Sequence, residues 1–395
     1  MNPLDLLAHL RARREEMASL LRDLALLESP SHEPATQEPV FARLAAELEA
    51  SGLRARRLRG RVSGGQLWAV PRERRRGAPA QLLIGHCDTV WPVGTLERMP
   101  VEVRDGRLCG PGVYDMKGGL VQGIFALRTL RDLGLAPEVE PAFFINSDEE
   151  IGSPESLHRI RKLARRVRRV FVLEPSLGPA GDLKTRRKGS LRFTIRTFGK
   201  AAHSGLDPEK GASAVRELSR IIQWLYTLEA PERGVTVNVG VIAGGMRANV
   251  VAPEARAELD VRVLTGEDAE RIEREVLALV AQTPGTRVEV TGGIDRPPLE
   301  PTPGNQALFN AALRGAAELG LALGEGTAGG ASDGSLTSRV TPTLDGLGAV
   351  GDGAHALHEH VVIDRMPERA ALLAYLLLIP SIAPPRGEMI PGRAT

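Results

Sequence analysis

The sequence predicts an α/β protein in which a three-layer α/β/α domain is interrupted by a smaller, inserted α+β domain. In residues 1–183, helix-like segments alternate with short apolar segments, as in a largely parallel sheet that helices cover on both faces. Residues 184–295 show longer segments of alternating polarity, and the first pattern resumes in residues 296–381. With 395 residues, the chain also exceeds the roughly 250–300 residues at which a single core stops growing.

The first part of the larger domain begins with two helical segments, and Gly52 closes the second of them. Short apolar runs that stop at polar residues then alternate with helical patterns. This alternation is typical of a parallel sheet, whose functional sites lie at the carboxyl ends of the strands. The expected elements are strands near 66–70 and 81–86, a helix over 120–134, and the alternating segments 138–150, 159–167 and 169–176.

The inserted segment follows the order β-α-β-β-α-β, which predicts a ferredoxin-like unit. Its strands alternate in polarity as exposed antiparallel strands do. The last residues, 382–395, are expected to form a loosely held tail. The expected elements of the insert are strands near 186–205, 236–245, 255–264 and 286–293, and helices over 211–228 and 267–285.

The composition argues against several classes of protein. A formal net charge of +2, from 51 basic and 49 acidic residues, disfavours a dedicated nucleic-acid or membrane-surface protein. The arginine-rich stretch 159–170 is interpreted as an exposed amphipathic helix. No segment resembles a signal peptide or reaches the roughly 18 apolar residues of a membrane span. The two cysteines, Cys87 and Cys109, fit a reducing compartment, so we expect a cytoplasmic protein. From the charge balance and the lack of a long apolar segment, we expect that it binds neither nucleic acid nor membranes.

Acids and histidines gather where the predicted strands end. Carboxylates that share one cleft repel each other and raise each other's pKa unless a cation keeps them ionised. Any one of these groups could equally be a helix cap or a loop residue, but their common edge favours a metal site. The groups are His86 with Asp88, Asp115, Asp148 to Glu150, Glu174, and the histidines of 353–360.

Imidazole and carboxylate without thiolate suit zinc, cobalt or manganese, whereas magnesium and calcium prefer oxygen ligands alone. A carboxylate that bridges two ions would hold them roughly 3.5–4 Å apart, and such a pair makes hydroxide from water near neutral pH. The sequence therefore predicts a site for two divalent cations.

Six stretches, in this order, carry a resemblance to a known family: "GHCDTVWPVGTL", "GPGVYDMKGGL", "SDEEIGS", "LEPS", "GKAAHSG" and "GAHALHEHVVI". Over about residues 20–380 the chain resembles the co-catalytic zinc aminoacylase/carboxypeptidase family of metallopeptidases. That family includes glutamate carboxypeptidase, succinyl-diaminopimelate desuccinylase and acetylornithine deacetylase. The resemblance implies a metallopeptidase domain with an inserted dimerisation (lid) domain, and hence a homodimer.

The resemblance also implies two Zn²⁺ per subunit, with Co²⁺ or Mn²⁺ as substitutes. Asp115 would bridge the two ions, and the peptide bond between Asp115 and Met116 would be cis. The last ligand histidine stands four residues before a glutamate in the family, which selects His355 before Glu359, with His358 as the alternative. The implied metal ligands are His86, Asp115, Glu150, Glu174 and His355.

Two further acids have roles beside the metal ligands. Asp88 follows His86 by two residues, so it points to the same side and can accept a hydrogen bond from the ligand imidazole. Glu149 resembles the general base of the family, which takes a proton from the attacking water and returns it to the leaving amine.

In the insert, His203 resembles the lid histidine that reaches into the partner subunit's site and stabilises the oxyanion. Asn249 and Arg262 resemble residues that bind a substrate carboxylate. The alternative interpretations are structural: a turn for Asn249 and an exposed strand position for Arg262. The glycine-rich loop with Ser332 and Asp333 either lines the substrate pocket or forms a simple turn.

These features predict a di-zinc hydrolase that cleaves an amide bond next to a free carboxylate. The wording of 88–119 is closest to the glutamate carboxypeptidase branch, so the first hypothesis is an exopeptidase that releases a C-terminal amino acid. The alternative is an N-acyl-amino-acid deacylase of the acetylornithine deacetylase or succinyl-diaminopimelate desuccinylase type. A chain that keeps the fold as a binding or regulatory protein is a third hypothesis, and an assay for bound zinc would distinguish it.

Overall fold

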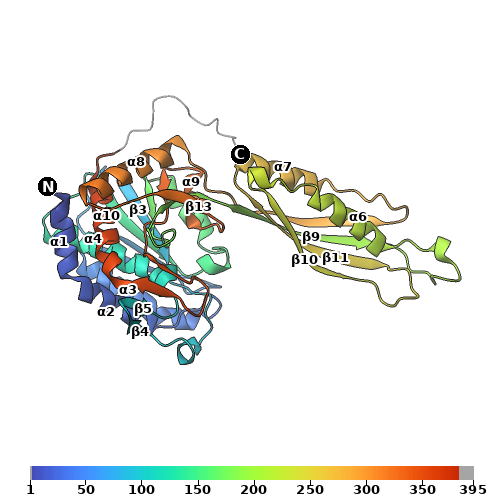
Figure 1. The fold of residues 1–395 in the computed structure, drawn as a ribbon, viewed down its shortest axis with the longest axis horizontal. Helices are drawn as coiled ribbons and strands as arrows, with labels where there is room; N and C mark the ends of the chain where they lie inside the picture. The colour runs from blue at the N-terminus through green and yellow to red at the C-terminus, as the bar shows by residue number, and fades with distance from the viewer. Residues whose placement is uncertain (1, 382–395) are drawn as a thin grey trace. The chain divides into compact units, whose positions relative to one another are not determined.

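The computed structural model describes residues 2–381 and divides into two compact units (Figure 1). Among the described residues, the first unit comprises 2–185, 301–327 and 332–381, and the second comprises Arg186–Glu300 and Ala328–Ala331. The sequence placed the insert at 184–295, which overlaps the second unit. The predicted tail, 382–395, lies outside the described residues.

A six-stranded sheet forms the centre of the first unit, in the order β1-β2-β6-β3-β7-β14. Strands β6, β3, β7 and β14 run parallel, as the alternation of helices and strands predicts, whereas β1 and β2 add an antiparallel edge. The bounds are β1 Leu53–Arg59, β2 Gly65–Pro71, β3 Ala80–His86, β6 Glu140–Asn146, β7 Val170–Val172 and β14 Thr343–Leu344.

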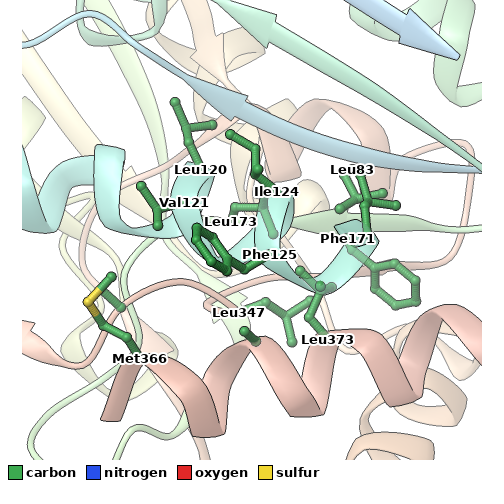
Figure 2. Packing of buried hydrophobic residues seen from close by; sticks show 14 of the residues in the cluster. Leu83, Leu120, Val121, Ile124, Phe125, Phe171, Leu173, Leu347, Met366 and Leu373 are labelled. Carbon is green, nitrogen blue, oxygen red and sulfur yellow. The ribbon is translucent and has the colours of Figure 1, made fainter. Parts of the chain in front are cut away.

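Helices cover both faces of this sheet and make the three predicted layers. On one face, Leu83 and Phe171 of the sheet pack against Phe125 of α4 and Leu373 of α10 (Figure 2). On the other face, Ile160 and Ala164 of the short helix α5 are buried against alternate strand residues. The helices are α1 Pro3–Ala12, α2 Arg14–Ala25, α3 Gln37–Ala50, α4 Gly118–Asp132, α5 Leu157–Ala164, α8 Pro303–Glu318, α9 Asp333–Ser338 and α10 Met366–Leu378.

A small four-stranded sheet, in the order β15-β16-β5-β4, pairs segments that are far apart in the sequence. It brings the residues before α4 next to the residues around 353–360, because β5 pairs with β16. Strands β8 and β13 pair as a separate two-stranded sheet. The bounds are β4 Glu102–Arg104, β5 Arg107–Cys109, β8 Leu183–Arg187, β13 Glu325–Ala328, β15 Gly351–Asp352 and β16 His360–Val362.

The second unit has the predicted β-α-β-β-α-β order and a wholly antiparallel sheet, β10-β11-β9-β12. Helices α6 and α7 pack on one face of this sheet, where alternate residues such as Ile195 and Leu259 are buried. Its other face carries the charged alternate residues, which explains the period of two in the sequence. The bounds are β9 Gly189–Phe198, α6 Ala214–Tyr226, β10 Thr236–Gly244, β11 Glu254–Val263, α7 Gly266–Leu277 and β12 Arg287–Arg296.

The three-layer domain and the α+β unit confirm the predicted fold class. Among residues 2–381, no helix combines the length and the apolar character that crossing a membrane demands.

Candidate metal centre

His86 is the last residue of β3 and is almost wholly buried. Its Nδ1 lies 3.0 Å from the backbone carbonyl oxygen of Asp88. Because a carbonyl oxygen only accepts hydrogen bonds, Nδ1 carries a proton and Nε2 turns the other way. Nε2 lies 3.3 Å from Oδ1 of Asp115 and 3.4 Å from Oε1 of Glu174. One imidazole nitrogen is thus fixed by the backbone, and the other faces two carboxylates.

Asp115 lies just before α4, and its peptide bond to Met116 is cis, as the family resemblance implies. Its carboxylate lies between two histidines, because Oδ2 is 3.5 Å from Nε2 of His355 while Oδ1 faces His86. A glycine makes this arrangement possible: a Cβ at Gly119 would lie 1.9 Å from the carbonyl oxygen of Leu173. Only glycine therefore allows α4 to begin so close to the end of β7, where Glu174 follows.

Glu149 and Glu150 belong to a single 3-10 turn, Glu149–Ile151, directly after β6. Oε2 of Glu150 lies 3.1 Å from Nε2 of His355. Two sets of possible ligand atoms each lie within 4.8 Å of one another: His86 with Glu149 and Glu174, and His86 with Asp115 and Glu150. The sheet edge thus brings together the acids and histidines that the sequence selects.

Asp88 holds the glutamate turn to the end of β3. Its fully buried carboxylate accepts hydrogen bonds from the backbone N–H groups of Glu149 (3.3 Å) and Glu150 (3.2 Å) and from the hydroxyl of Ser31 (2.7 Å). The imidazole of His86 donates to the backbone carbonyl of Asp88, and the carboxylate expected to accept that bond lies 3.4 Å from Nδ1. Asp88 thus positions both sides of the cluster.

The charges of the cluster depend strongly on one another. Burial acts to raise the pKa of Asp115, but the neighbouring imidazoles of His355 and His86 hold this pKa well below its usual range. Burial, together with the charge of Asp115, raises the pKa of Glu150 to about 7. Contacts with Asp115 and Glu150 raise the pKa of His355 to about 10. In the protein alone, protons on the histidines therefore balance the carboxylates.

A divalent cation would replace those protons. Nε2 of His86 and Oδ1 of Asp115 are buried, and neither has a hydrogen-bond partner among residues 2–381. Buried polar atoms are rarely left unpaired, so these two atoms fit the ligands of a cation. Burial raises the pKa of Cys87 to about 12, which argues against a thiolate ligand. The donor set is imidazole and carboxylate, which suits zinc, cobalt or manganese.

The structure separates the two candidates for the last histidine. His355 contacts both Asp115 and Glu150, whereas Nε2 of His358 lies 3.9 Å from a carboxylate oxygen of Asp352 on the surface. The side chain of His358 is 68% exposed. The cluster therefore contains His355.

Glu359 has a place in the cluster that the sequence did not reveal. In the sequence, Glu359 only marks the spacing that selects His355. In the structure, its carboxylate is fully buried and accepts hydrogen bonds from the segment 112–115. The sequence does contain one clue. Glu359 immediately precedes the strand-like segment "HVVI", and a glutamate beside a buried strand is seldom buried unless it has a polar partner.

The remaining predicted residues lie in the second unit. His203 is exposed, and its Nδ1 accepts hydrogen bonds from the N–H groups of Gly205 and Leu206, both at 3.1 Å. Its proton is therefore on Nε2. Asn249 is exposed in a loop, and its backbone carbonyl oxygen accepts a hydrogen bond from the N–H of Ser204 at 3.1 Å.

Arg262 makes a two-pronged ion pair with its own strand. Its Nε and Nη2 lie 2.7 and 3.0 Å from the two carboxylate oxygens of Asp260. The fork that would recognise a substrate carboxylate is thus engaged within the chain. Ser332 and Asp333 are buried in the first unit, where Asp333 accepts hydrogen bonds from Asn146 and Ser153. That burial favours the structural alternative for this loop.

A family profile described as "Peptidase family M20/M25/M40" matches residues 82–379, which include every residue of the cluster. The chain belongs to peptidase family M20/M25/M40. The predicted recognition and the predicted enzyme class, a metal-dependent hydrolase, are confirmed by this match together with the relatives that follow.

Three relatives illustrate the range of the M20/M25/M40 family. Carboxypeptidase G2 from Pseudomonas sp. (strain RS-16) is 28% identical over 342 residues, which cover 85% of this chain and 82% of that protein. Succinyl-diaminopimelate desuccinylase from Paracidovorax citrulli (strain AAC00-1) is 30% identical over 319 residues, covering 75% and 80%. Acetylornithine deacetylase from Myxococcus xanthus is 29% identical over 273 residues, covering 65% and 69%.

Solved structures share the fold. Aminopeptidase PepT from Bacillus cereus ATCC 10987 superposes with a TM-score of 0.73 at 20% identity and covers 92% of this chain and 98% of its own. The M20 family metallo-carboxypeptidase Sso-CP2 from Sulfolobus solfataricus gives a TM-score of 0.67 at 18% identity, with coverage of 92% and 98%. At these identities the likeness supports the fold of the M20/M25/M40 family.

Proposed function

We propose that this protein is a di-zinc amidohydrolase that releases an amino acid with a free carboxylate from a peptide or an N-acyl group. One observation carries the proposal: the carboxylate of Asp115 lies between His86 and His355 and directs one oxygen to each. Each histidine also faces a second carboxylate, Glu174 or Glu150. Two similar half-sites that share one carboxylate are the arrangement that a pair of cations requires.

One zinc would be held by His86 and Glu174, the other by His355 and Glu150, with Asp115 shared. When bound, the ions would polarise the scissile carbonyl and lower the pKa of a water molecule. Co²⁺ and Mn²⁺ suit the same ligands, so the native metal has to be measured.

Glu149 is the proposed general base and acid. It lies beside His86 and Glu174, while its neighbour Glu150 faces His355, so the two adjacent glutamates divide into one proton carrier and one ligand. Glu149 would accept a proton from the attacking water and deliver it to the leaving amine. Asp88 supports this role because it fixes the backbone N–H of both glutamates.

The second unit would supply contacts to the substrate. Nε2–H of His203 is free to donate because Nδ1 accepts from the backbone, and we assign it to the oxyanion. Asn249 and Arg262 are assigned to the free carboxylate, with Arg262 exchanging its bond to Asp260 for the substrate. We also propose a homodimer formed through this unit, since its edge strand β10 exposes Val241 and Ile242.

The similarity to carboxypeptidase G2 covers 85% of this chain, and it favours release of a C-terminal amino acid such as glutamate. The deacylases among the relatives favour the second candidate, removal of an acyl group from an amino acid. A cytoplasmic location remains a prediction from the two cysteines.

Metal removal and a panel of substrates test the proposal. Dialysis against a chelator is expected to abolish hydrolysis of N-acyl amino acids and dipeptides with a free carboxylate, and zinc or cobalt to restore it. The Glu149→Gln protein is expected to bind the same amount of zinc while kcat falls by roughly 10²–10⁴-fold, the usual share of a general base. Full activity after chelation, or an unchanged kcat in Glu149→Gln, would contradict the proposal.

A further inference from the structure

Glu359 lies between β15 and β16, four residues after His355, and its side chain is wholly buried. Four N–H groups donate to its carboxylate. Oε1 accepts from the backbone N–H groups of Tyr114 (2.9 Å) and Asp115 (3.0 Å). Oε2 accepts from Gly112 N–H (3.0 Å) and from the indole of Trp91 (2.9 Å).

These four bonds use the full capacity of a carboxylate, which has about four lone-pair positions. An ionised carboxylate without partners would be too costly to bury, and bonds of N–H groups to a charged acceptor are stronger than neutral ones. The side chain is therefore held in a single orientation and holds its donors in turn.

The donors come from two of the segments that carry the cluster. Trp91 follows the His86 strand end, and the backbone from Gly112 to Asp115 leads to the bridging carboxylate. Glu359 itself belongs to the segment of His355. Gly112 has a φ of 71°, and a Cβ there would lie 2.5 Å from the Cγ2 atom of Thr89, so the loop has little room for another path.

We propose that Glu359 is a positioning residue that fixes the backbone of Asp115 against the His355 segment and thereby sets the affinity for the second cation. This inference rests on the proposed di-metal function. Glu359 contacts neither substrate nor metal in this assignment. It acts through Asp115, because the N–H of that residue donates directly to Oε1.

The substitution Glu359→Gln separates positioning from packing. Glutamine has the same shape, but its NH₂ group donates, so one pair of N–H groups loses its acceptor and faces another donor. Either the N–H groups of Tyr114 and Asp115, which face Oε1, or those of Gly112 and Trp91, which face Oε2, must then move. Glu217→Gln is a matched control, since Glu217 is also fully buried and accepts from the backbone N–H groups of Gln282 and Thr283 in the second unit.

The test titrates the metal-free full-length protein and both variants with Zn²⁺ and with Co²⁺ and measures the heat of binding and the cobalt absorption. In Glu359→Gln we expect one of the two equivalents to bind roughly 10–100-fold more weakly, the usual effect of losing a partner that orients a metal ligand. Its activity is expected to return as metal is raised. Glu217→Gln is expected to bind both equivalents as the wild type does.

The outcomes separate the two proposals. A wild-type protein that binds no divalent cation overturns the proposed function. A wild type that binds two, with Glu359→Gln matching both affinities within about threefold, overturns the role of Glu359 alone. If Glu359→Gln does not fold, Trp91→Phe removes a single donor to Oε2, and a smaller loss of the same equivalent is expected. Unchanged metal binding in Trp91→Phe then counts against the role.

Discussion

The acids and histidines of the first unit and the polar residues of the second differ in how firmly they are held. His86, Asp88 and Glu359 are buried, and backbone groups hold their side chains; those that hold Asp88 and Glu359 come from distant segments. The side chain of His203 is exposed and accepts hydrogen bonds from its own loop, and Arg262 pairs with a residue two positions away. The chain thus buries most of the proposed metal centre, with His355 half-exposed, and leaves the proposed substrate contacts nearer the surface.

The two sheets explain this difference. Parallel strands that end at one edge deliver side chains from several segments to the same place, where loops can bury them. An antiparallel sheet with one open face places every second residue on that face, as with the exposed Arg192 and the half-buried Asp260 and Arg262. In the first case the side chains are ordered before anything binds, whereas Arg262 would have to exchange its bond to Asp260 for a bond to the substrate.

The largest effect is expected from the proposed metal centre, and His355→Ala tests it, because this half-exposed histidine contacts two carboxylates of the cluster. This variant removes the group that faces Asp115 and Glu150, so those carboxylates lose the cation or proton that balances them. We expect loss of one zinc equivalent and a fall in kcat of roughly 10²–10⁴-fold, comparable to the loss of another essential catalytic group. Metal analysis and steady-state kinetics measure both.

His358→Ala is the matched control, three residues along the same loop. Because His358 is exposed and its Nε2 lies 3.9 Å from a carboxylate oxygen of Asp352, we expect zinc content and kcat to stay within about twofold of the wild type. The reverse result, with His358→Ala inactive and His355→Ala active, would exchange the two histidines and contradict the geometry.

A smaller effect is expected on the polar face of the second unit, from the half-buried Arg262 in Arg262→Ala. If its fork recognises a substrate carboxylate, removal costs a charged hydrogen bond, and KM rises by roughly 10–100-fold while kcat changes less. Arg192→Ala is the control, because Arg192 shares the polar face and is 66% exposed, and its contacts to Asp260 and Asp295 are long, at 3.8 and 3.6 Å. Equal KM values in both variants would remove Arg262 from substrate recognition.

The same contrast shows what the sequence could predict. Four of the proposed metal ligands could be selected from the sequence, because each follows an apolar run or precedes a helix and the ends of parallel strands converge. These residues are His86, Asp115, Glu150 and Glu174. The bonds of Glu359 could not, since its donors lie more than 240 residues away in the chain and are mostly backbone N–H groups, which no side-chain pattern encodes. The antiparallel edge of β1 and β2 was missed for a similar reason: strand order depends on long-range pairing.

Arg262 illustrates the opposite limit. The resemblance assigns it a ligand, and the alternation of β11 places it on the open face, but neither reveals that Asp260 occupies its fork. Such local pairs depend on rotamers, and a sequence pattern does not specify them.

The smallest effect on activity is expected from Glu217→Gln, which instead changes the stability of the second unit with pH. Burial acts to raise the pKa of Glu217, but hydrogen bonds from Arg220, Thr283 and Gln282 lower it to about 2, below its ordinary 4.5. Stability from this group is therefore fully present above pH 4.5 and is lost as the pH falls toward 2. Relative to the wild type, we expect Glu217→Gln to be less stable by about 1–3 kcal/mol at pH 7.

That deficit is expected to shrink as the pH falls from 5 to 3, because only the wild type loses the contribution of an ionised Glu217 in this range. Urea unfolding at several pH values, with hydrogen exchange of peptides from 211–286 to report the second unit, measures it. Zinc content and kcat at neutral pH should match the wild type, since Glu217 lies in the second unit and contacts none of the cluster. A stability deficit that stays constant with pH would contradict the prediction, because it would mean that Glu217 keeps its ordinary pKa in the folded protein. The stability of the second unit would then depend little on the charge of this buried group.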